Sequence, residues 1–219
     1  MKFQIQREDL LIPLQKIIGA VEKRQTMPAL SNILVKADKD KISLTATDLE
    51  IELVTTLTMV ADEAGETTLP ARKLLDICKA LPEDSNISIS VDTINAIIKS
   101  GRSRFSLSTL PADDFPALES INTVAEFDLP QTTLKELIDK TSFAMALQDV
   151  RYSLNGLLLE VSTGLLRAVA TDGHRLAYCE KQADCKLAEI KQVIVPRKGI
   201  QELVRLLDNS NEPIKIILG

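Results

Sequence analysis

Aromatic residues are scarce in this chain of 219 residues: they make up 3% of it, and tryptophan is absent. Aliphatic side chains therefore have to build the core, because Leu, Ile, Val and Ala are the apolar residues left to bury. Hydrophobic residues at 45% and charged residues at 26% are typical of a soluble globular protein. The length suffices for one large domain or two ordinary ones.

Cysteine is also rare, and its spacing is uninformative. Cys78, Cys179 and Cys185 are odd in number and include no Cys-x-x-Cys pair. This argues against a disulfide framework or a zinc site and favours free thiols in a reducing compartment. The start of the chain lacks the apolar stretch of a signal peptide, and no apolar run reaches the length of a membrane span. We therefore predict a cytoplasmic protein with no membrane partner.

Sequence signatures of common enzymes are missing as well. The chain contains no Gly-x-Gly-x-x-Gly, no Gly-Lys-Ser/Thr loop, no His-Glu-x-x-His and no Gly-x-Ser-x-Gly. Its only histidine, His174, stands in "VATDGHRLAY". A hydrolase would use Asp172 and His174 as an acid–base pair, with Ser153 or a cysteine as nucleophile. In the other interpretation Asp172 and Gly173 form a hairpin turn, and His174 begins the outgoing strand.

A shift of 124 residues aligns the chain with itself, which indicates a tandem duplication. The clearest correspondences are Phe3 with Phe127, Leu10 with Leu134, Leu14 with Ile138, and Ala46-Thr47-Asp48 with Ala170-Thr171-Asp172. The first copy thus carries the same Ala-Thr-Asp without a histidine, in "TATDLEIEL", and still has the pattern of a hairpin. The repeat therefore favours the turn over the hydrolase, and it predicts two domains, 1–124 and 125–219.

Both copies show the same order of elements. A short strand precedes an amphipathic helix, several β-rich runs follow, and a strand ending in Pro70 or Pro196 leads into a second helix. Asp9 and Thr132 or Thr133 are the expected helix caps. The predicted fold class is α+β, with two helices packed on antiparallel sheet in each of two pseudo-symmetric domains. The second copy lacks counterparts of residues 93–110, the last two strands, so we expect a piece of a longer protein.

The distribution of charge and the alternation of polar and apolar residues predict two interaction surfaces. The net charge of −5 argues against a body coated by nucleic acid, but it leaves room for a local basic surface. Such a surface is expected along the helices, although a basic helix face is also compatible with simple solvation. The basic residues there are Arg7, Lys16, Lys23, Arg24, Arg72, Lys73, Lys79, Lys135, Lys140, Arg197, Lys198 and Arg205. The alternating segment "GRSRFSLSTLP" is either a sheet edge that pairs with another chain or an ordinary interior strand.

Several motifs together resemble one family. "ATDGHRLA", "VPRKG", "LPARK", "SGRSRFSLSTLP" followed by "FP", and "QDVRYSLNG" are similar to the bacterial DNA polymerase III β subunits, the replicative sliding clamps. The resemblance covers the whole chain and implies the DNA-clamp fold: three α+β domains per protomer, two protomers closing head to tail into a ring around duplex DNA. This chain would hold the first domain and part of the second, with the third absent.

The resemblance also implies roles for individual residues and partners. The implied partners are double-stranded DNA, the polymerase III catalytic subunit, the clamp loader, and other polymerases and repair proteins with clamp-binding motifs. The implied location is the cytoplasm, at replication forks. The resemblance implies no catalytic residue, metal or cofactor. The expected sites are DNA contacts at Arg24, Gln148, Tyr152, Arg197 and Lys198, a peptide pocket at Leu154, Thr171, Gly173, His174, Arg175 and Leu176, and a homodimer edge at Lys73, Arg102, Arg104, Phe105 and Leu107.

The leading functional hypothesis is therefore a non-catalytic processivity factor that encircles DNA and docks partners through short peptides. Two alternatives remain open: a peptide-docking scaffold without a DNA role, and a hydrolase built on Asp172 and His174.

Overall fold

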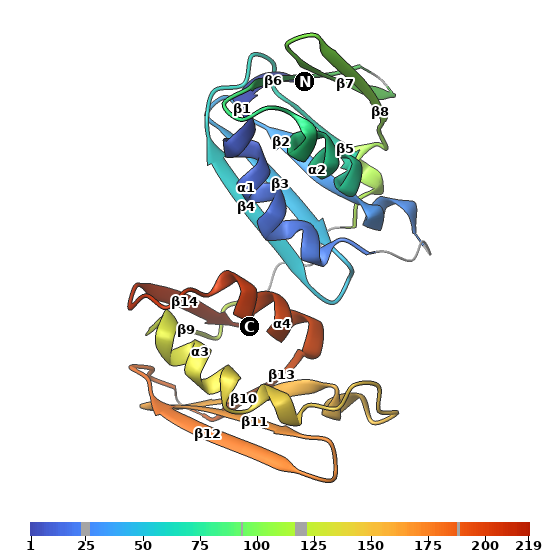
Figure 1. Cartoon of the computed structure of the whole chain (residues 1–219). Coiled ribbons are helices and arrows are strands. Elements are labelled where there is room, and N and C mark those ends of the chain that lie inside the picture. The colour runs from blue at the N-terminus through green and yellow to red at the C-terminus, as the bar shows by residue number, and fades with distance from the viewer. Residues whose placement is uncertain (23–26, 93, 117–121, 188) are drawn as a thin grey trace. The chain divides into compact units, whose positions relative to one another are not determined.

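The order of helices and strands repeats along the chain (Figure 1). The structure is a computed structural model, and it describes residues 1–22, 27–92, 94–116, 122–187 and 189–219. By internal contacts it divides into a first unit, Met1–Leu118, and a second unit, Glu119–Gly219.

The first unit contains two helices and eight strands among its described residues. In chain order these are β1 (Lys2–Gln6), α1 (Arg7–Ile17), β2 (Asn32–Ala37), β3 (Lys41–Thr47), β4 (Glu52–Thr58), β5 (Gly65–Pro70), α2 (Ala71–Ala80), β6 (Asn86–Val91), β7 (Asn95–Ser100) and β8 (Ser103–Ser108). The strands form two antiparallel sheets, β4-β3-β2-β5 and β1-β6-β7-β8. Short 3₁₀ turns occur at Ile18–Ala20, Pro28–Ser31 and Ala112–Asp114.

The second unit follows the same order up to its last described strand. Its elements are β9 (Ala125–Pro130), α3 (Gln131–Asp139), β10 (Gly156–Ser162), β11 (Leu165–Thr171), β12 (Leu176–Gln182), β13 (Lys191–Pro196), α4 (Arg197–Leu206) and β14 (Pro213–Leu218), with 3₁₀ turns η4 (Ser142–Ala144) and η5 (Tyr152–Leu154). The sheet β12-β11-β10-β13 matches β4-β3-β2-β5, and the pair β14-β9 matches β6 and β1. The α+β class predicted from the sequence is confirmed.

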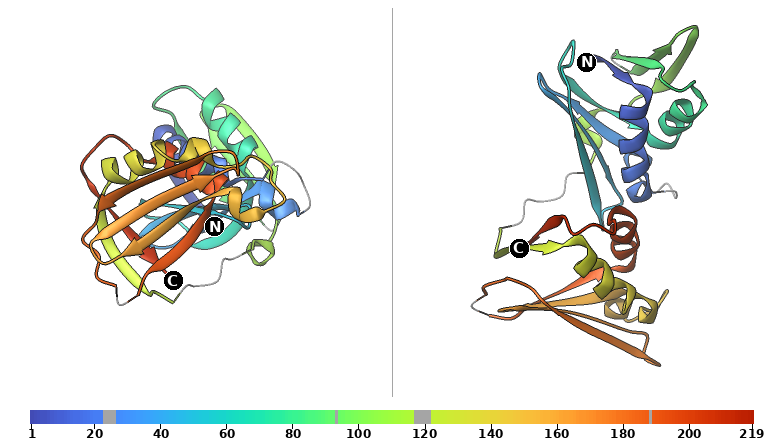
Figure 2. Two further views of the ribbon diagram at one scale, coloured as in Figure 1. Left: turned by 90° about the horizontal axis from the view of Figure 1, so that it is seen from below. Right: turned by 60° about the vertical axis from the view of Figure 1, so that its left-hand side comes forward.

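Helices cover one face of the four-stranded sheet in each unit (Figures 1 and 2). α1 packs over β3 and β4 and α2 over β2 and β5, while α3 and α4 take the same places over β11, β12, β10 and β13. The apolar spacing explains this packing, because Leu74, Leu75 and Cys78 of α2 and Leu134 and Leu137 of α3 are the side chains that become buried. Each fully buried aliphatic side chain contributes roughly 1.5–3 kcal/mol to folding.

The helix starts differ from the sequence prediction. α1 begins at Arg7 and α3 at Gln131, so Asp9, Thr132 and Thr133 lie inside the first turn, and no side chain caps either helix. The capping prediction is wrong because strand β1 or β9 runs directly into its helix, which leaves no intervening loop residue to act as a cap.

The Thr–Asp turn is built in the same way in both units. In the first, the Thr47 hydroxyl donates to the Ile51 carbonyl (2.8 Å), and the Asp48 carboxylate accepts the backbone N–H groups of Glu50 (3.0 Å) and Ile51 (2.9 Å). In addition, Leu49 donates its N–H to Thr47 Oγ1.

The second unit repeats each of these bonds 124 positions later. Thr171 donates to the Arg175 carbonyl (2.7 Å), Gly173 donates to Thr171 Oγ1 (3.1 Å), and Asp172 accepts from the N–H groups of His174 and Arg175 (3.0 Å each). The hairpin interpretation is therefore confirmed. Strand β12 begins at Leu176, however, so His174 belongs to the turn and not to the strand.

Strand β8 is the last strand of its sheet, with β7 as its neighbour. Within the described part of the chain it is thus an edge strand, and the interior alternative is wrong. Leu107 is buried, Phe105 is half-buried, and Arg102 and Arg104 are exposed, as is Lys73 on the same unit's helix α2. Pairing of this edge with another chain stays a prediction.

One position in the turn distinguishes the two copies energetically. Leu49 has a φ of 78° and Gly173 a φ of 86°, a region in which side chains with a Cβ are strained by about 1–2 kcal/mol. We predict that Leu49→Gly raises the free energy of unfolding by up to about 1 kcal/mol, since the relief of strain exceeds the entropy cost of glycine. Gly173→Ala should lower it by about 1 kcal/mol.

Urea unfolding of the variants measures both effects. Leu49→Ala is the matched control, because it shortens the side chain but keeps the Cβ and hence the strain. A Leu49→Gly variant less stable than Leu49→Ala contradicts the strain at this position.

Candidate functional site

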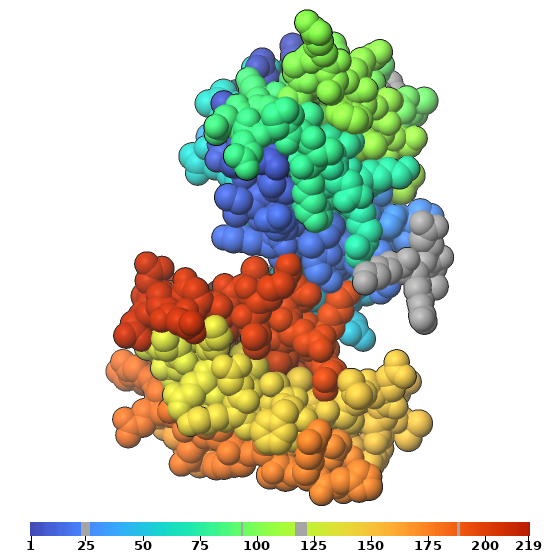
Figure 3. Space-filling model, viewed as in Figure 1, coloured from blue at the N-terminus to red at the C-terminus, as the bar shows by residue number. Residues whose placement is uncertain are grey.

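A cavity of about 350 Å³ opens beside the Thr–Asp turn of the second unit. Its walls come from η4 and the segment after it, from the turn between β11 and β12, and from the start of α4. The lining residues are Phe143, Met145, Ala146, Leu147, Gln148, Asp149, Asp172, His174, Arg175 and Arg197. Figure 3 shows part of the golden-yellow segment to which the first six of these belong at the surface of the second unit, although Met145 and Ala146 are themselves buried.

The carboxylate of Asp172 is committed to the turn. It accepts the backbone N–H groups of His174 and Arg175, and its second oxygen accepts from Arg175 Nε at 3.0 Å. The backbone N–H of His174 is the main cause that lowers the Asp172 pKa, with Arg175 adding to it. Because the pKa is depressed, this stabilisation is present above the ordinary carboxyl pKa and is lost as the pH falls through the lowered value.

The hydrogen bonds of Asp172 also bear on whether His174 could act as a general base. A general-base histidine needs a partner that orients its imidazole, but the bonds of the Asp172 carboxylate go to backbone N–H groups and to Arg175. The turn consequently holds His174 as part of a cavity wall, and the hydrolase alternative is not favoured.

Arg175 ties the turn to the neighbouring 3₁₀ segment. Its Nη2 donates to the Phe143 carbonyl at 2.7 Å, and its guanidinium carbon lies 5.6 Å from the centre of the Phe143 ring. A cation over an aromatic face adds about 0.5–1 kcal/mol at an exposed site. One arginine thus fixes two sides of the cavity relative to each other.

Arg197 fixes a third side. From the first position of α4 it donates to the carbonyl oxygens of Met145 (3.0 Å) and Ala146 (3.4 Å). Both of those residues are buried. A predicted DNA contact therefore also has a structural task, which is to anchor the segment that follows η4 to the helix.

The loop that leads into β10 is closed by polar contacts. Arg151 donates two side-chain bonds to the Asp149 carboxylate (2.9 Å each), and the Asn155 amide donates to the Asp149 carbonyl. The Arg151 side chain is the main cause that lowers the pKa of Asp149 to about 2. Arg151 also lies over Gly173, where its Nη2 is 3.1 Å from the position that a Cβ would occupy. Glycine at this position therefore lets the loop approach the turn.

Two large apolar side chains that line this cavity are exposed, Leu147 at 76% and Phe143 at 57%. Val150 (90%), Tyr152 (87%) and Leu176 (66%) are exposed as well and lie close in sequence to lining residues. Exposed apolar side chains rimmed by polar groups are typical of sites that bind a protein or a ligand.

The structure brings together only part of each predicted set. His174 and Arg175 line the cavity, while Thr171 and Gly173 shape the turn behind it, Leu154 is half-buried in η5, and Leu176 is exposed at the start of β12. Gln148 and Arg197, predicted as DNA contacts, line the same cavity, and Tyr152 lies exposed nearby in sequence. Lys198 is half-buried on α4, and Arg24 lies outside the described residues.

Sequence reasoning missed Phe143, Met145 and Asp149. Their contribution depends on backbone carbonyls and on a loop closed by side chains, which leave no periodic signal. The acid–x–arginine spacing of Asp149 and Arg151 was the one hint that the sequence contains.

Some helix cations are committed to neighbours. Arg7 donates to the Cys78 carbonyl (2.7 Å) and pairs with Glu8, and Lys140 pairs with Glu136. Exposed pairs add little stability, but they reduce the charge that these faces offer to phosphates. On α2, Arg72, Lys73 and Lys79 are exposed.

Metal, thiol and membrane features complete the description of the residues that the structure covers. No group of three or more His, Cys, Asp or Glu residues there is placed to hold a metal ion. All three cysteines are free, and burial raises the pKa of Cys78 to about 12. No helix in these same residues is both long and apolar enough to span a bilayer.

Comparison with known proteins agrees with this picture. Residues 1–119 match the family model of the DNA polymerase III beta subunit, N-terminal domain, and residues 128–219 match that of its central domain. The Beta sliding clamp of Pseudomonas aeruginosa is 56% identical over 220 residues, covering 100% of this chain and 60% of that protein. This chain thus spans about 60% of the length of the curated relatives it matches.

Solved structures give the same result. The DNA polymerase III subunit beta from Pseudomonas aeruginosa superposes with a TM-score of 0.95 at 55% identity, over 100% of this chain and 60% of the other. A DnaN sliding clamp from the same organism, bound to griselimycin, superposes with a TM-score of 0.93 at 55% identity and the same coverage. The chain belongs to the DNA polymerase III beta subunit family, the bacterial sliding clamps.

Proposed function

We propose that this chain is the first part of a non-catalytic processivity clamp, which encircles duplex DNA as a head-to-tail homodimer and docks its partners through short peptides. The observation that carries the docking role is the cavity beside the Thr–Asp turn of the second unit. Two arginines hold its walls together, and the exposed apolar side chains of Phe143 and Leu147 line it. The partners are the polymerase III catalytic subunit, the clamp loader, and other polymerases and repair proteins, in the cytoplasm at replication forks.

The peptide site consists, in this proposal, of Leu154, Thr171, Gly173, His174, Arg175 and Leu176. Leu176 is 66% exposed and able to lie against an incoming apolar side chain. Burying such a side chain on binding is favourable by about 25 cal/mol per Å² of apolar surface. The turn residues supply the polar rim that orients the peptide backbone.

The DNA contacts are Arg24, Gln148, Tyr152, Arg197 and Lys198. Contacts of this kind read phosphates without reading sequence, which suits a protein that slides. The protomer contact uses edge strand β8, through Phe105 and Leu107 with Arg102, Arg104 and Lys73 around them. Main-chain groups on an edge strand are available for pairing with a second chain.

We propose that griselimycin, to which the related Pseudomonas aeruginosa clamp is bound, also binds this chain and does so at the peptide site. Leu176→Ala should then weaken its binding roughly fivefold to tenfold, since truncating an interface anchor costs about 1 kcal/mol or more. Calorimetric titration measures the affinity. Ile94→Ala is the matched control, because Ile94 is 69% exposed in the first unit. His174→Ala should weaken binding as well, and it should abolish no turnover. Equal affinity for Leu176→Ala and wild type contradicts the assigned site.

We further predict that the complete gene product, loaded by its clamp loader, stays on circular DNA and leaves when the circle is cut. Charge reversal at Arg24 and Lys198 should shorten retention on the circle. It should also reduce the slope of log affinity against log salt by about 1 for each phosphate that the variant no longer neutralises. Retention is followed by gel filtration of labelled protein. Equal loss from circles and linear DNA would rule out encirclement, and unchanged retention of the reversed variant would favour a scaffold without a DNA role.

A further inference from the structure

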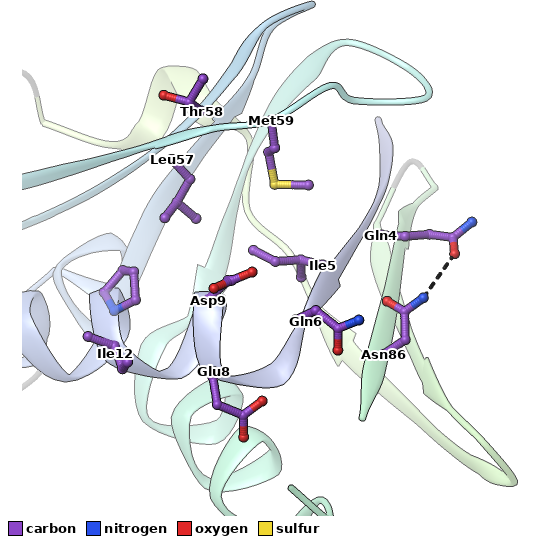
Figure 4. Close-up of a pocket in the computed structure, with 11 residues that line it drawn as sticks. Gln4, Ile5, Gln6, Glu8, Asp9, Ile12, Leu57, Thr58, Met59 and Asn86 are labelled. Carbon is purple, nitrogen blue, oxygen red and sulfur yellow. Dashed lines mark hydrogen bonds between the residues drawn. The ribbon is translucent and has the colours of Figure 1, made fainter. Parts of the chain in front are cut away.

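The first unit has a larger cavity of its own, of about 620 Å³, at the junction of β1, the start of α1 and the end of β4 (Figure 4). Its apolar lining consists of Ile5, Ile12, Pro13, Leu57 and Met59. Its polar lining consists of Gln4, Gln6, Glu8, Asp9, Thr58 and Asn86. Ile12 is 53% exposed, although it is a large aliphatic residue on a helix.

The equivalent place in the second unit has a different pair of residues. The 124-residue shift places Ile12 on Glu136 and Leu57 on Lys181. Strand register supports the match, because Leu57 pairs with Ile42 in the first unit and Lys181 with Leu166 in the second. Glu136 and Lys181 form a 2.7 Å ion pair across this position. At this position the first unit thus has an apolar pair that lines a cavity, whereas the second unit has an ion pair.

A second difference concerns the backbone at the cavity. Pro13 lies inside α1 and has no N–H, so the carbonyl of Asp9 lacks its donor at the α-helical spacing. The corresponding residue of α3 is Leu137, which has an N–H to donate. Asp9 and Pro13 both line the cavity.

The charged lining residues of the cavity are both acidic, but one of them, Glu8, is paired with Arg7 at 2.6 Å. Among the described residues that line it, the charged ones are Glu8 and Asp9. A hydrogen bond from Arg7 is the main cause that lowers the Glu8 pKa, so this carboxylate is ionised at neutral pH. Gln4, Gln6 and Asn86 add amide donors and acceptors, and Figure 4 shows Gln4 and Asn86 bonded to each other at 3.4 Å.

We propose that this cavity binds a short peptide segment of a partner protein, in which an aliphatic side chain is flanked by lysine or arginine. The aliphatic side chain packs against Ile12, Leu57 and Met59. A flanking cation faces the carboxylate of Asp9, which is exposed, while the carboxylate of Glu8 is already paired with Arg7. Nucleic acid fits less well, because its phosphates would meet the carboxylate of Asp9. The site is separate from the one in the second unit and does not depend on the function proposed for it.

The test uses a fluorescein-labelled basic peptide, acetyl-Lys-Arg-Leu-Leu-Lys-Arg-amide, and its acidic counterpart with Glu in place of Lys and Arg. Fluorescence anisotropy with this chain measures both affinities at low and at moderate salt. The decisive variant is Ile12→Glu with Leu57→Lys, which copies the ion pair of the second unit into the first. We expect it to weaken the basic peptide at least tenfold, and we expect the acidic peptide to bind at least tenfold more weakly than the basic one to wild type.

Two further variants guard against misfolding and misassignment. Asp9→Asn removes one charge from an exposed position and should weaken the basic peptide a fewfold and flatten its salt dependence. Leu176→Ala, in the second unit, should leave the affinity unchanged. With the wild-type chain, the proposal is overturned if the basic peptide does not bind, if both peptides bind equally, or if the peptide only displaces a second copy of the chain from this face. With the variants, it is overturned if the double variant and Asp9→Asn bind the basic peptide like wild type, or if Leu176→Ala abolishes binding.

Discussion

The site in the second unit depends on one local interaction: a short carboxylate side chain that satisfies the backbone of its own turn. Asp172 accepts two N–H groups of the turn, and Thr171 closes it from the other side. Because these bonds are local, the turn is formed by its own sequence, and it needs little from the rest of the unit. Thr47 and Asp48 make the same hydrogen bonds in the first unit, so this turn is a feature of the repeated domain.

The two copies then diverged on this common frame. In the first, residue 49 is a leucine at positive φ and residue 51 an isoleucine. In the second, the equivalents are Gly173, which admits Arg151 above the turn, and Arg175, which reaches Phe143. The two units also differ at the other end of the paired strands, where the second copy has an ion pair and the first an apolar pair that lines a cavity.

Much of the fold follows from local patterns in the sequence. Leu134, Leu137 and Ile138 lie at helical spacing, and burial of these three side chains makes α3 pack as predicted. The helix starts were mispredicted because each first helix follows its strand without a loop. The cavity was only partly predictable, since His174 and Arg175 stand in a recognisable motif whereas Arg197 acts on carbonyls some fifty positions away. Such contacts are fixed by tertiary packing, and single-sequence periodicity does not encode them.

The central claim is that the Asp172 turn holds the cavity of the second unit together through Arg175. Amide hydrogen exchange of Asp172→Ala tests it most directly, with Asp48→Ala as the matched variant in the first unit. The account predicts that Asp172→Ala speeds exchange in the turn and also in residues 143–146, because the Arg175 bond to the Phe143 carbonyl is released. Asp48→Ala should affect its own turn alone, since the alkyl side chain of Ile51 has no donor to offer. Unchanged exchange at residues 143–146 in Asp172→Ala would contradict the account.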